Sequence, residues 1–541
     1  MKDLIKKEIK KTLIQLDYYD KEINIILSTP KNKDFGDLAT NISFILSKKL
    51  NLDPIKIAEN IKKYLNKSEL FNSISIIKPG FINFFLNPQY LNKKLNDVIL
   101  KNKKYGYNSS GKNKQVLIEF VSANPTGPLT VGHGRGAILG DVIANILTWN
   151  GYKVDREYYY NNAGRQMRIL GESVKSRYLE IIGQKTIFPD DGYHGTYIKD
   201  IAKNLVDKTK TNPLSNNADI TIFKDAAEEF VFNQIKKTLK KLKIKFNSFF
   251  NEITLYENKD IDEVIKRLKN KKLIYEKDGA VWFNGIKAGR ESDRVLIKST
   301  GEPTYRLPDM AYHINKLERN YDLCIDIFGA DHMDAYPDVL EVVHQLGFDK
   351  SNIKVLIHQF ISVLKNGKQV KMSTRKATYI TLDELIEQVS PDVVRYFFIM
   401  RGINSHLNFD LDVAKEKSEK NPIYYIQYAN ARINTILDAN NIKTDGYDLS
   451  LLTEESEIKL IYKLIDFKEV INKISEIMEP QILANYLLEL SSMFHKYYSK
   501  NRIINDGDIE LTKARLIFIK SISIVITNGL SILGISAPKK M

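Results

Sequence analysis

From residue 115 to about residue 390, short apolar runs alternate with longer runs whose apolar residues recur every three or four positions. The first pattern is typical of buried strands and the second of helices, so their alternation predicts an α/β sheet built from crossover units. Residues 116–121, 136–149 and 153–160 form the first strand, helix and strand of one such unit. Because parallel strands can be joined only by a crossover of this kind, this region constrains the fold most strongly.

Two regions with different patterns flank the alternating one. The N-terminal region mixes amphipathic helices with short alternating stretches such as 81–86, and it ends in a polar segment at 101–114 that is typical of a linker. Beyond Pro391 the apolar residues follow helical spacing almost continuously. We therefore predict a multidomain chain with an α+β domain at 1–105, an α/β domain at 106–390 and an all-α helical bundle at 391–541.

Charge and cysteine content narrow the possible partners. The chain has 81 Lys and Arg residues against 66 Asp and Glu, a net charge of +15, which favours a polyanionic partner such as nucleic acid, a nucleotide or an anionic membrane. A solvated basic surface in a chain rich in Ile, Lys and Asn explains the charge equally well. The single cysteine, Cys324, excludes an intramolecular disulfide and a cysteine-cluster metal site, and it fits a reducing cytoplasm.

Two segments bear on the membrane. Residues 1–16 repeat charged side chains every few positions, so they predict an amphipathic helix and not a signal peptide. The most apolar stretch, 516–535, is interrupted by polar residues that include Lys520 and Asn528. A bilayer helix needs ~20 mostly apolar residues, so we predict a buried helix of a soluble domain there.

A glycine-rich segment follows the first strand of the α/β region. Gly132, Gly134 and Gly136 lie where strand, loop and helix N-terminus are expected to meet. Free backbone N–H groups and the positive end of a helix dipole attract an anion, and glycines allow it to approach closely, so the segment predicts a phosphate site. The spacing does not match the dinucleotide fingerprint, and a turn with a purely structural role is the alternative.

Two motifs carry a resemblance to a known family. The segment Thr130-Val131-Gly132-His133, within SANPTGPLTVGHGRGA, resembles the HIGH signature of class I aminoacyl-tRNA synthetases in its arginyl-tRNA synthetase form. Lys371-Met372-Ser373-Thr374-Arg375 resembles the KMSKS element of the same class. The resemblance continues in the segments 35–48, 191–198, 329–332 and 405–433, so it covers nearly the whole chain. It implies an N-terminal additional domain, a Rossmann-like catalytic domain with a connective insertion, and a helical anticodon-binding domain.

The resemblance implies an ATP site in the α/β domain. His133 would donate to phosphate oxygens, and cations at 371–376 would neutralise the departing pyrophosphate. Thr130 stands where the signature has its first histidine, and Thr374 stands where it has its second lysine, so Lys371, Arg375 or Lys376 would share that lysine's role. The catalytic candidates are His133, Thr130, Lys371, Arg375 and Lys376. The ATP-binding candidates are Pro128, Gly132, His133, Gly134, Gly136, Gly329, Asp331, His332, Lys371, Met372 and Ser373.

An arginine pocket needs carboxylates that accept forked hydrogen bonds from a guanidinium. Glu119 lies within an apolar strand, where an unpaired charge is costly to bury. Asp309 follows Pro308 in the first turn of a predicted helix, where stabilisation of the helix dipole is the alternative role. The resemblance implies that Glu119, Tyr305 and Asp309 bind the guanidinium and that Asn124 binds the α-ammonium. The substrate-binding candidates are completed by Ser122, Ala123 and Gln166, the last of which could equally be a surface loop amide.

A face of the C-terminal region mixes aromatic and hydrogen-bonding side chains at helical spacing. Splayed anticodon bases could stack on such a face, although a helix that packs tyrosines into a core has the same pattern. The tRNA-binding candidates are Tyr424, Tyr425, Tyr428, Asn430 and Arg432.

These motifs together predict an ATP-dependent arginine–tRNA ligase without an editing domain. The expected partners are arginine tRNA, L-arginine and ATP with Mg²⁺ as co-substrate, and we expect neither a resident metal nor an organic cofactor. We further expect a cytoplasmic monomer that does not bind membranes. A non-catalytic tRNA- or RNA-binding paralogue is the main alternative, and a nucleotide-binding redox enzyme fits the glycine spacing and the 371–376 segment less well.

Overall fold

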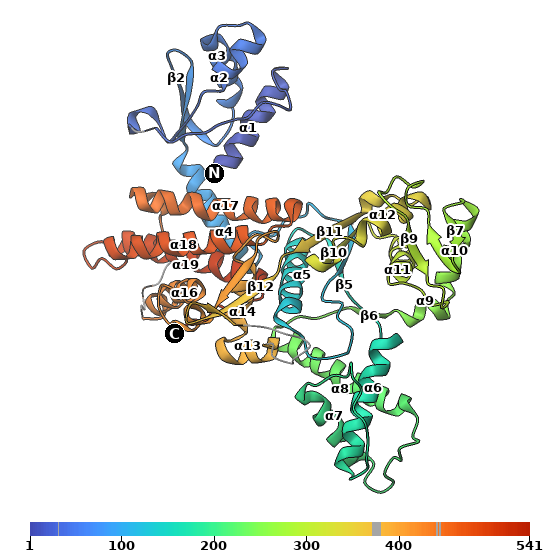
Figure 1. The fold of residues 1–541 in the computed structure, drawn as a ribbon. Coiled ribbons are helices and arrows are strands. Elements are labelled where there is room, and N and C mark those ends of the chain that lie inside the picture. Colours follow the sequence, from blue (N-terminus) through green and yellow to red (C-terminus); the bar gives the residue numbers. More distant parts are fainter. Residues whose placement is uncertain (31, 371–379, 440–441, 443–444) are drawn as a thin grey trace.

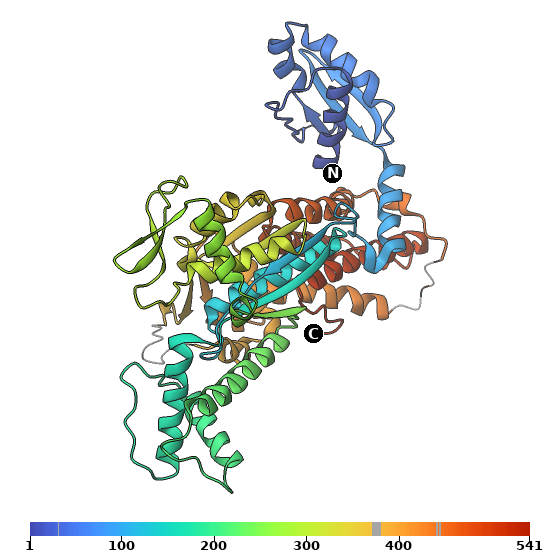
Figure 2. The ribbon, with the colours of Figure 1, turned by 90° about the vertical axis from the view of Figure 1, so that its right-hand side faces the viewer.

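The computed structural model describes residues 1–541 except 31, 371–379, 440–441 and 443–444. Figures 1 and 2 show a small N-terminal unit at one end, an α/β body beside a helical bundle in the middle, and a helical arm that projects at the opposite end.

The N-terminal unit is an α+β layer of helices on an antiparallel sheet of order β1-β3-β2. Asp53 caps α3 by accepting a hydrogen bond from the backbone N–H of Ile55 at 2.6 Å, and Pro54 occupies the first turn. The last helix, α4, leaves this unit and packs on α17 and α19 of the bundle (Figure 1). The elements are α1 (Lys2–Gln15), β1 (Leu38–Thr40), α2 (Ile42–Leu50), α3 (Pro54–Leu65), β2 (Phe71–Ile77), β3 (Phe81–Leu86) and α4 (Pro88–Lys101).

The central sheet has five parallel strands in the order β11-β10-β4-β5-β6. The predicted crossover unit is therefore confirmed as β4, α5 and β5. Strands β5 and β6 continue the sheet on one side of β4, whereas β10 and β11 lie on the other, so the strand order reverses between β4 and β10. The elements are β4 (Gln115–Glu119), α5 (Val131–Trp149), β5 (Lys153–Tyr160), β6 (Ser248–Asn251), β10 (Leu323–Gly329), α12 (Tyr336–Gln345) and β11 (Ile353–His358).

Two insertions interrupt the sheet. The first, between β5 and β6, is the projecting arm of Figure 1, made of α6 (Gly164–Ile181), α7 (Thr196–Lys208) and α8 (Ile220–Lys241). The second precedes β10 and carries a small antiparallel sheet of order β7-β8-β9. Its elements are α9 (Ile253–Glu257), α10 (Asp260–Asn270), β7 (Ile274–Lys277), β8 (Ala280–Phe283), β9 (Arg294–Ile297) and α11 (Arg306–Glu318).

The C-terminal region is helical, as predicted, except at its start. Strand β14 pairs in parallel with β12, and β13 completes a three-stranded sheet, so the chain just beyond Pro391 is still tied to the α/β body. Helical periodicity alone did not reveal β14, because a four-residue strand is too short to show a period. The elements are β12 (Ile361–Lys365), β13 (Lys368–Gln369), α13 (Leu382–Val389), α14 (Pro391–Ile399), β14 (Leu407–Asp410), α15 (Leu411–Lys415), α16 (Pro422–Asp438), α17 (Glu455–Ile477), α18 (Gln481–Lys500) and α19 (Ile509–Ile532).

Helix α19 alone among the described helices is long and apolar enough to cross a membrane by length and composition. In the fold, 83% of its most apolar window is buried, because α19 packs against α16, α18, α4 and α5. It is a core helix of the bundle, which agrees with the prediction for this stretch.

A buried arginine joins the α/β body to the bundle. The guanidinium of Arg395 on α14 donates to the carbonyl oxygens of Leu533 and Leu242, each at 2.7 Å, and forms a salt bridge with Asp141 on α5. The side chain has no exposed surface. Four separate segments therefore meet at one cation.

Replacing Arg395 by Met should lower the free energy of unfolding by about 3 kcal/mol, because it leaves the buried Asp141 carboxylate without its closest cation. Chemical denaturation followed by circular dichroism measures the change. The control is Arg401→Met, an exposed arginine just beyond the same helix, which should change stability by less than about 0.5 kcal/mol. Equal effects of the two substitutions would contradict the role assigned to Arg395.

Candidate active site

Polar side chains gather at the carboxyl ends of the central strands, on both sides of the point where the strand order reverses. Glu119 ends β4, Asp326 lies opposite it on β10, and His358 ends β11. Ligands of open α/β sheets bind in the crevice at this position, so the fold itself indicates where the site lies.

Glu119 is buried but not unpaired, which differs from the expectation from sequence. Its carboxylate accepts a hydrogen bond from Ser122 Oγ at 2.8 Å and one from the ammonium of Lys316 at 2.7 Å. Lys316 also donates to Asp326 at 2.6 Å, and neither Lys316 nor Asp326 has exposed surface. The cation comes from α11, which lies far from Glu119 in sequence, so no local pattern around Glu119 could reveal it.

The chain turns sharply after Glu119, so the strand predicted over 116–121 ends two residues early. Val121 and Ser122 have φ angles of 71° and 44°. A β-branched valine rarely adopts this left-handed conformation. The turn brings the Ser122 hydroxyl back to Glu119 and exposes the following segment to the crevice.

Ala123 and Asn124 follow this turn along the end of β5. The carbonyl oxygen of Ala123 accepts a hydrogen bond from the hydroxyl of Tyr158 at 2.8 Å. Asn124 Oδ1 accepts one from the backbone N–H of Asn161 at 2.9 Å, and its amide nitrogen faces Gln166 Oε1 at 3.5 Å. Gln166 lies in the first turn of α6 and not in a surface loop, so the structure brings these two predicted residues together.

Asp309 lies in the first turn of α11, as predicted, although the helix begins at Arg306. Burial is the main cause that raises the pKa of its carboxyl group to about 7, and the nearby carboxylates of Glu119 and Glu252 raise it further. The ring of Tyr305, at the N-terminus of the same helix, is 73% exposed. The structure thus places Asp309 near Glu119 and leaves Tyr305 open to solvent.

The glycine-rich segment belongs to a helix earlier than predicted. Helix α5 starts at Val131, and Thr130 is its N-cap, so Gly132 and His133 lie in its first turn. A Cβ at Gly134 would lie 2.7 Å from Leu382, and one at Gly136 would lie 3.0 Å from the ring of His358, whereas Gly132 meets only the Thr130 hydroxyl, 3.6 Å away. Glycine is therefore needed at 134 and 136 for close packing, and only Gly132 is exposed.

His133 is held in one tautomer. The backbone N–H of Thr130 donates to its Nδ1 at 3.2 Å, so in the neutral ring the proton resides on Nε2. Burial lowers the pKa of His133, which keeps the ring neutral near pH 7. The result is a neutral Nε2–H donor at the N-terminus of a helix.

Two further residues of this region were missed from sequence. Arg135 is fully buried and donates to the carbonyl oxygens of Gln359, Gly402 and Ser405, so this arginine of the glycine-rich segment anchors α5. His358 packs beside Gly136 and Gly329, and burial is the main cause that lowers its pKa to about 4. No local sequence pattern indicates the role of either residue, because each makes its contacts with segments distant in sequence.

The segment at the end of β10 is open to solvent. Gly329 ends the strand, and Ala330–His332 form a short 3-10 helix. The side chains of Asp331 and His332 are 70% and 54% exposed, and His332 Nε2 lies 3.8 Å from Asp331 Oδ2. Both residues are therefore available to a ligand at the crevice.

The predicted residues Lys371, Met372, Ser373, Thr374, Arg375 and Lys376 lie outside the described residues. Just beyond them, the chain contacts the segment at the start of α5: Thr381 forms a β-bridge with Thr130, and the N–H of Leu382 donates to the carbonyl oxygen of Leu129 at 2.8 Å. Pro128 is half-buried in the loop that makes these contacts.

The predicted tRNA face on α16 is divided between core and surface. Asn430 is 1% exposed, its amide donates to the carbonyl of Pro538 and its oxygen accepts from Ser523, so it is committed to helix packing and cannot contact a ligand. Tyr424 and Tyr428 stack with ring centroids 6.1 Å apart, and Arg432 lies 4.5 Å over the Tyr428 ring. Tyr425 packs against His495 of α18, so these four half-buried side chains form one aromatic and cationic surface.

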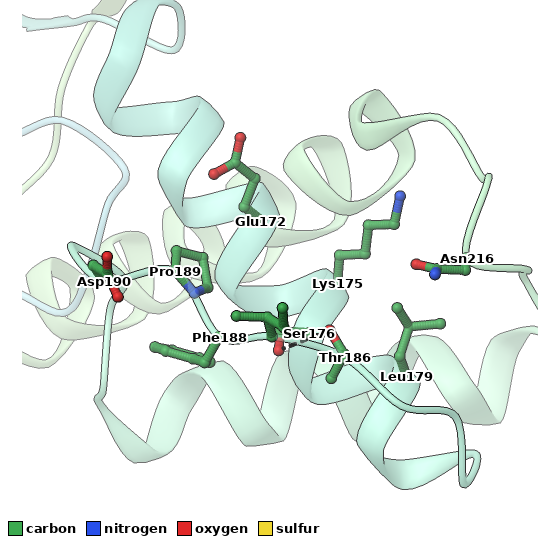
Figure 3. Close-up of a pocket in the computed structure, with 10 residues that line it drawn as sticks. Glu172, Lys175, Ser176, Leu179, Thr186, Phe188, Pro189, Asp190 and Asn216 are labelled. Atoms are coloured by element: carbon green, nitrogen blue, oxygen red, sulfur yellow. Dashed lines mark hydrogen bonds between the residues drawn. The ribbon is translucent and has the colours of Figure 1, made fainter.

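A cavity of about 380 Å³ lies elsewhere, between α6, the segment after it and Asn216. Figure 3 shows the side chains that line it. Its lining residues are Glu172, Lys175, Ser176, Leu179, Thr186, Ile187, Phe188, Pro189, Asp190 and Asn216. None of the predicted site residues lines it, so this cavity belongs to the arm and not to the crevice.

Sequence signals for the remaining buried site residues did exist. Asp326 interrupts an apolar strand in the same way as Glu119 does. Asp309, His313 and Lys316 follow one another at spacings of four and three, which places them on one face of a helix. The structure confirms this face: His313 contacts the carbonyl of Asp309 at 2.7 Å and the carboxylate of Asp326 at 3.0 Å.

Three family models match the chain. They are described as "Arginyl tRNA synthetase N terminal domain" over residues 2–86, "tRNA synthetases class I (R), catalytic domain" over 94–395, and "DALR anticodon binding domain" over 426–541.

Curated relatives match over the full length. An arginine–tRNA ligase of Desulfotalea psychrophila is 46% identical over 519 residues, which cover 95% of this chain and 94% of the relative. One from Chlorobium phaeobacteroides is 44% identical over 100% of both chains. The solved structure of Thermus thermophilus arginyl-tRNA synthetase has a TM-score of 0.76 over 100% of both chains at 20% identity, which shows the shared fold.

The cap position of Thr130 allows a direct test. Thr130→Ala should lower stability by about 1 kcal/mol, because it removes the hydroxyl that accepts from the N–H of His133. Thr130→Ser keeps the hydroxyl and should match the wild type in thermal unfolding. A similar loss in both variants would assign the effect to the methyl group and contradict the capping role.

Proposed function

The chain belongs to the arginyl-tRNA synthetase family of class I aminoacyl-tRNA synthetases, and from this membership we propose how its own residues carry out the reaction. It is an ATP-dependent arginine–tRNA ligase. Its substrates are arginine, ATP and the arginine tRNA. The residue-level proposal is supported by the position of Glu119 at the end of β4, of His133 in the first turn of the helix that follows, and by the interaction between the carboxyl groups of Glu119 and Asp309.

Glu119 and Asp309 bind the guanidinium of the substrate. The charge of Glu119 contributes to the raised pKa of Asp309, so the two carboxyl groups are near enough to share one cation. A guanidinium presents forked donors that suit two carboxylates. Lysine has no forked donor pair, and citrulline has a carbonyl oxygen in place of one donor nitrogen, so either would leave a buried carboxylate unpaired. Tyr305 is exposed in this structure, and in our proposal its ring covers the bound guanidinium. Ser122 orients the Glu119 carboxylate through its hydrogen bond.

The α-amino end of arginine lies along the turn after β4. We assign it to Asn124, with the backbone of Ala123 and the amide of Gln166 beside it. The hydrogen bond from Asn161 to Asn124 and the proximity of Gln166 support this placement, because they orient the Asn124 side chain toward the crevice.

ATP lies between the start of α5 and the end of β10. His133 donates from Nε2 to a phosphate oxygen, and the N-terminus of α5 around Gly132 adds its dipole, with Pro128 beside it. Gly134 and Gly136 contribute indirectly, because they let α5 pack closely on Leu382 and His358. Thr130 contributes as the N-cap of α5, where its backbone N–H orients the ring of His133. Gly329, Asp331 and His332 contact the ribose or the amino acid from the other side.

Basic side chains of the segment 371–376 bind the pyrophosphate as it leaves. Lys371, Arg375 and Lys376 have this role, and Met372 and Ser373 contact the nucleotide. The bridge between Thr381 and Thr130 supports the proposal, because it anchors the chain just beyond this segment at the start of α5.

The reaction has two steps. An oxygen of the arginine carboxylate attacks the α-phosphorus of ATP, and the bond to the β-phosphate breaks, which gives arginyl-adenylate and pyrophosphate. A hydroxyl of the terminal adenosine of the tRNA then attacks the arginyl carbonyl and releases AMP. Positioning and electrostatic stabilisation suffice for the first step.

We propose that Mg²⁺ enters as the ATP complex and is held by phosphate oxygens. The described part of the chain has no group of three or more His, Cys, Asp or Glu side chains that could hold a metal ion. Mg²⁺ commonly binds through substrate phosphates and water in this way.

The three regions divide the contacts with tRNA. Residues 1–105 contact the tRNA body, 106–390 bind its 3′ end, and 391–541 bind the anticodon through Tyr424, Tyr425, Tyr428 and Arg432, with Asn430 supporting them from the core. Stacked tyrosines with an arginine over one ring suit unpaired bases. We further propose a cytoplasmic monomer that does not bind membranes.

Pyrophosphate exchange tests the arginine pocket. The wild type should show arginine-dependent exchange when tRNA is present, since the family implies that tRNA precedes the adenylate. Glu119→Gln should raise the KM for arginine roughly 10- to 100-fold, because it removes a charged acceptor, and should change the KM for ATP far less. Equal effects on the KM values for arginine and ATP would contradict the place of Glu119 in the pocket. Absence of exchange by the wild type with arginine, ATP and tRNA all present would favour a non-catalytic tRNA-binding protein.

The raised pKa of Asp309 predicts a pH dependence. The guanidinium binds the carboxylate form, and the carboxyl pKa is about 7 in the free protein, so arginine affinity should increase from pH 6 to pH 8 and level off above that. Calorimetric titration with L-arginine across this range measures the effect. Asp309→Asn should bind weakly and without this dependence, and a flat profile for the wild type would contradict the assignment.

A further inference from the structure

The buried ammonium of Lys316 has no role in the reaction as proposed above, yet it lies directly beneath the arginine pocket. It donates to Glu119 at 2.7 Å and to Asp326 at 2.6 Å, and it lies 4.4 Å over the ring of Tyr312. With no exposed surface it cannot reach a ligand itself. Within the described part of the chain, its ion pairs are with the two carboxylates of β4 and β10.

These two carboxylates occupy paired positions of adjacent strands. Glu119 and Asp326 are direct partners in the parallel register of β4 and β10. Both side chains are buried, at 2% and 0% exposure. Two carboxylates this close in a buried place cannot both stay ionised without a cation, because one would take up a proton.

We propose that Lys316 is a positioning residue for arginine specificity: its ammonium holds Glu119 and Asp326 ionised together and thereby presents the Glu119 carboxylate to the guanidinium. This inference rests on the proposed role of Glu119. Ser122 Oγ holds one oxygen of that carboxylate and Lys316 the other, so the group has a single orientation, and each oxygen retains a further acceptor site for the substrate.

The other groups around the pair do not replace Lys316. His313 contacts the second oxygen of Asp326 at 3.0 Å and does not bond to Glu119 among the described contacts. Arg319 is committed to Glu157 through two hydrogen bonds at 2.8 and 2.7 Å. The titratable groups near the pair are Asp309, His313, Tyr312, Tyr159 and Cys324, together with Glu157, the register partner of Glu119 on β5.

Lys316→Met tests the proposal. Without the ammonium, Glu119 and Asp326 share a proton at neutral pH, so the Kd for L-arginine should rise roughly ten- to hundredfold at pH 7 and recover toward the wild-type value by about pH 9. In this variant, the binding of arginine should therefore release one more proton than in the wild type. The Kd for ATP should stay within about threefold of the wild type, since the nucleotide contacts lie elsewhere. Calorimetric titration with each ligand measures both.

The double variant Lys316→Met with Asp326→Asn separates positioning from structural support. It removes the cation together with the competing carboxylate and keeps an acceptor for His313, so arginine affinity and the wild-type pH profile should return to within about threefold. If Lys316 only supported the fold, the double variant would bind no better than the single one, or both ligands would be affected equally; either result would overturn the proposal.

Two controls complete the design. Lys269→Met, an exposed lysine on the neighbouring helix α10, should leave both affinities unchanged. If Lys316→Met does not fold, Lys316→Gln carries the same prediction, because it is neutral but can donate to both carboxylates. A wild type without arginine-dependent exchange refutes the proposed function, whereas an active wild type with an unaltered pH profile in Lys316→Met or Lys316→Gln refutes this inference alone.

Discussion

The parallel pairing of β4 with β10 is the contact on which the site depends, and it places like charges opposite each other. Glu119 and Asp326 are register partners in the buried sheet, and the ammonium of Lys316 lies between them. Removing this cation would leave two buried carboxylates in mutual repulsion. The strand order reverses between β4 and β10. The two carboxylates buried at this position are compensated by Lys316 of α11.

Buried guanidiniums have a similar function at the joints between parts of the molecule. Arg135 binds carbonyl groups of the segments after β11 and after α14, and Arg395 binds α5, the end of α8 and the end of α19. Carbonyl groups at segment ends have no partner within their own helix or strand, so an arginine with several donors can satisfy them together. These contacts connect the central sheet to the helices of the C-terminal region.

The glycine-rich signature combines residues with two kinds of role. Thr130, Gly134 and Arg135 build and pack the start of α5, whereas Gly132 is exposed and His133 is half-buried. The backbone N–H of Thr130 also fixes the tautomer of His133, so the residue that caps the helix also orients the proposed phosphate donor. A signature of this kind identifies a family because both roles must be met within a few residues.

The sequence by itself determined the α/β crossover, the helical C-terminal region and the family, because period and motif are local properties that can be read without the fold. It also identified Glu119 and Asp309 as candidates. It did not show that Lys316 pairs with Glu119, that Asn430 is buried, that Gln166 lies in the first turn of a helix, or that β14 joins a sheet. Only the tertiary structure decided these points, because each depends on contacts between segments far apart in the chain, and the cost of burying a charge is known only once its partner is.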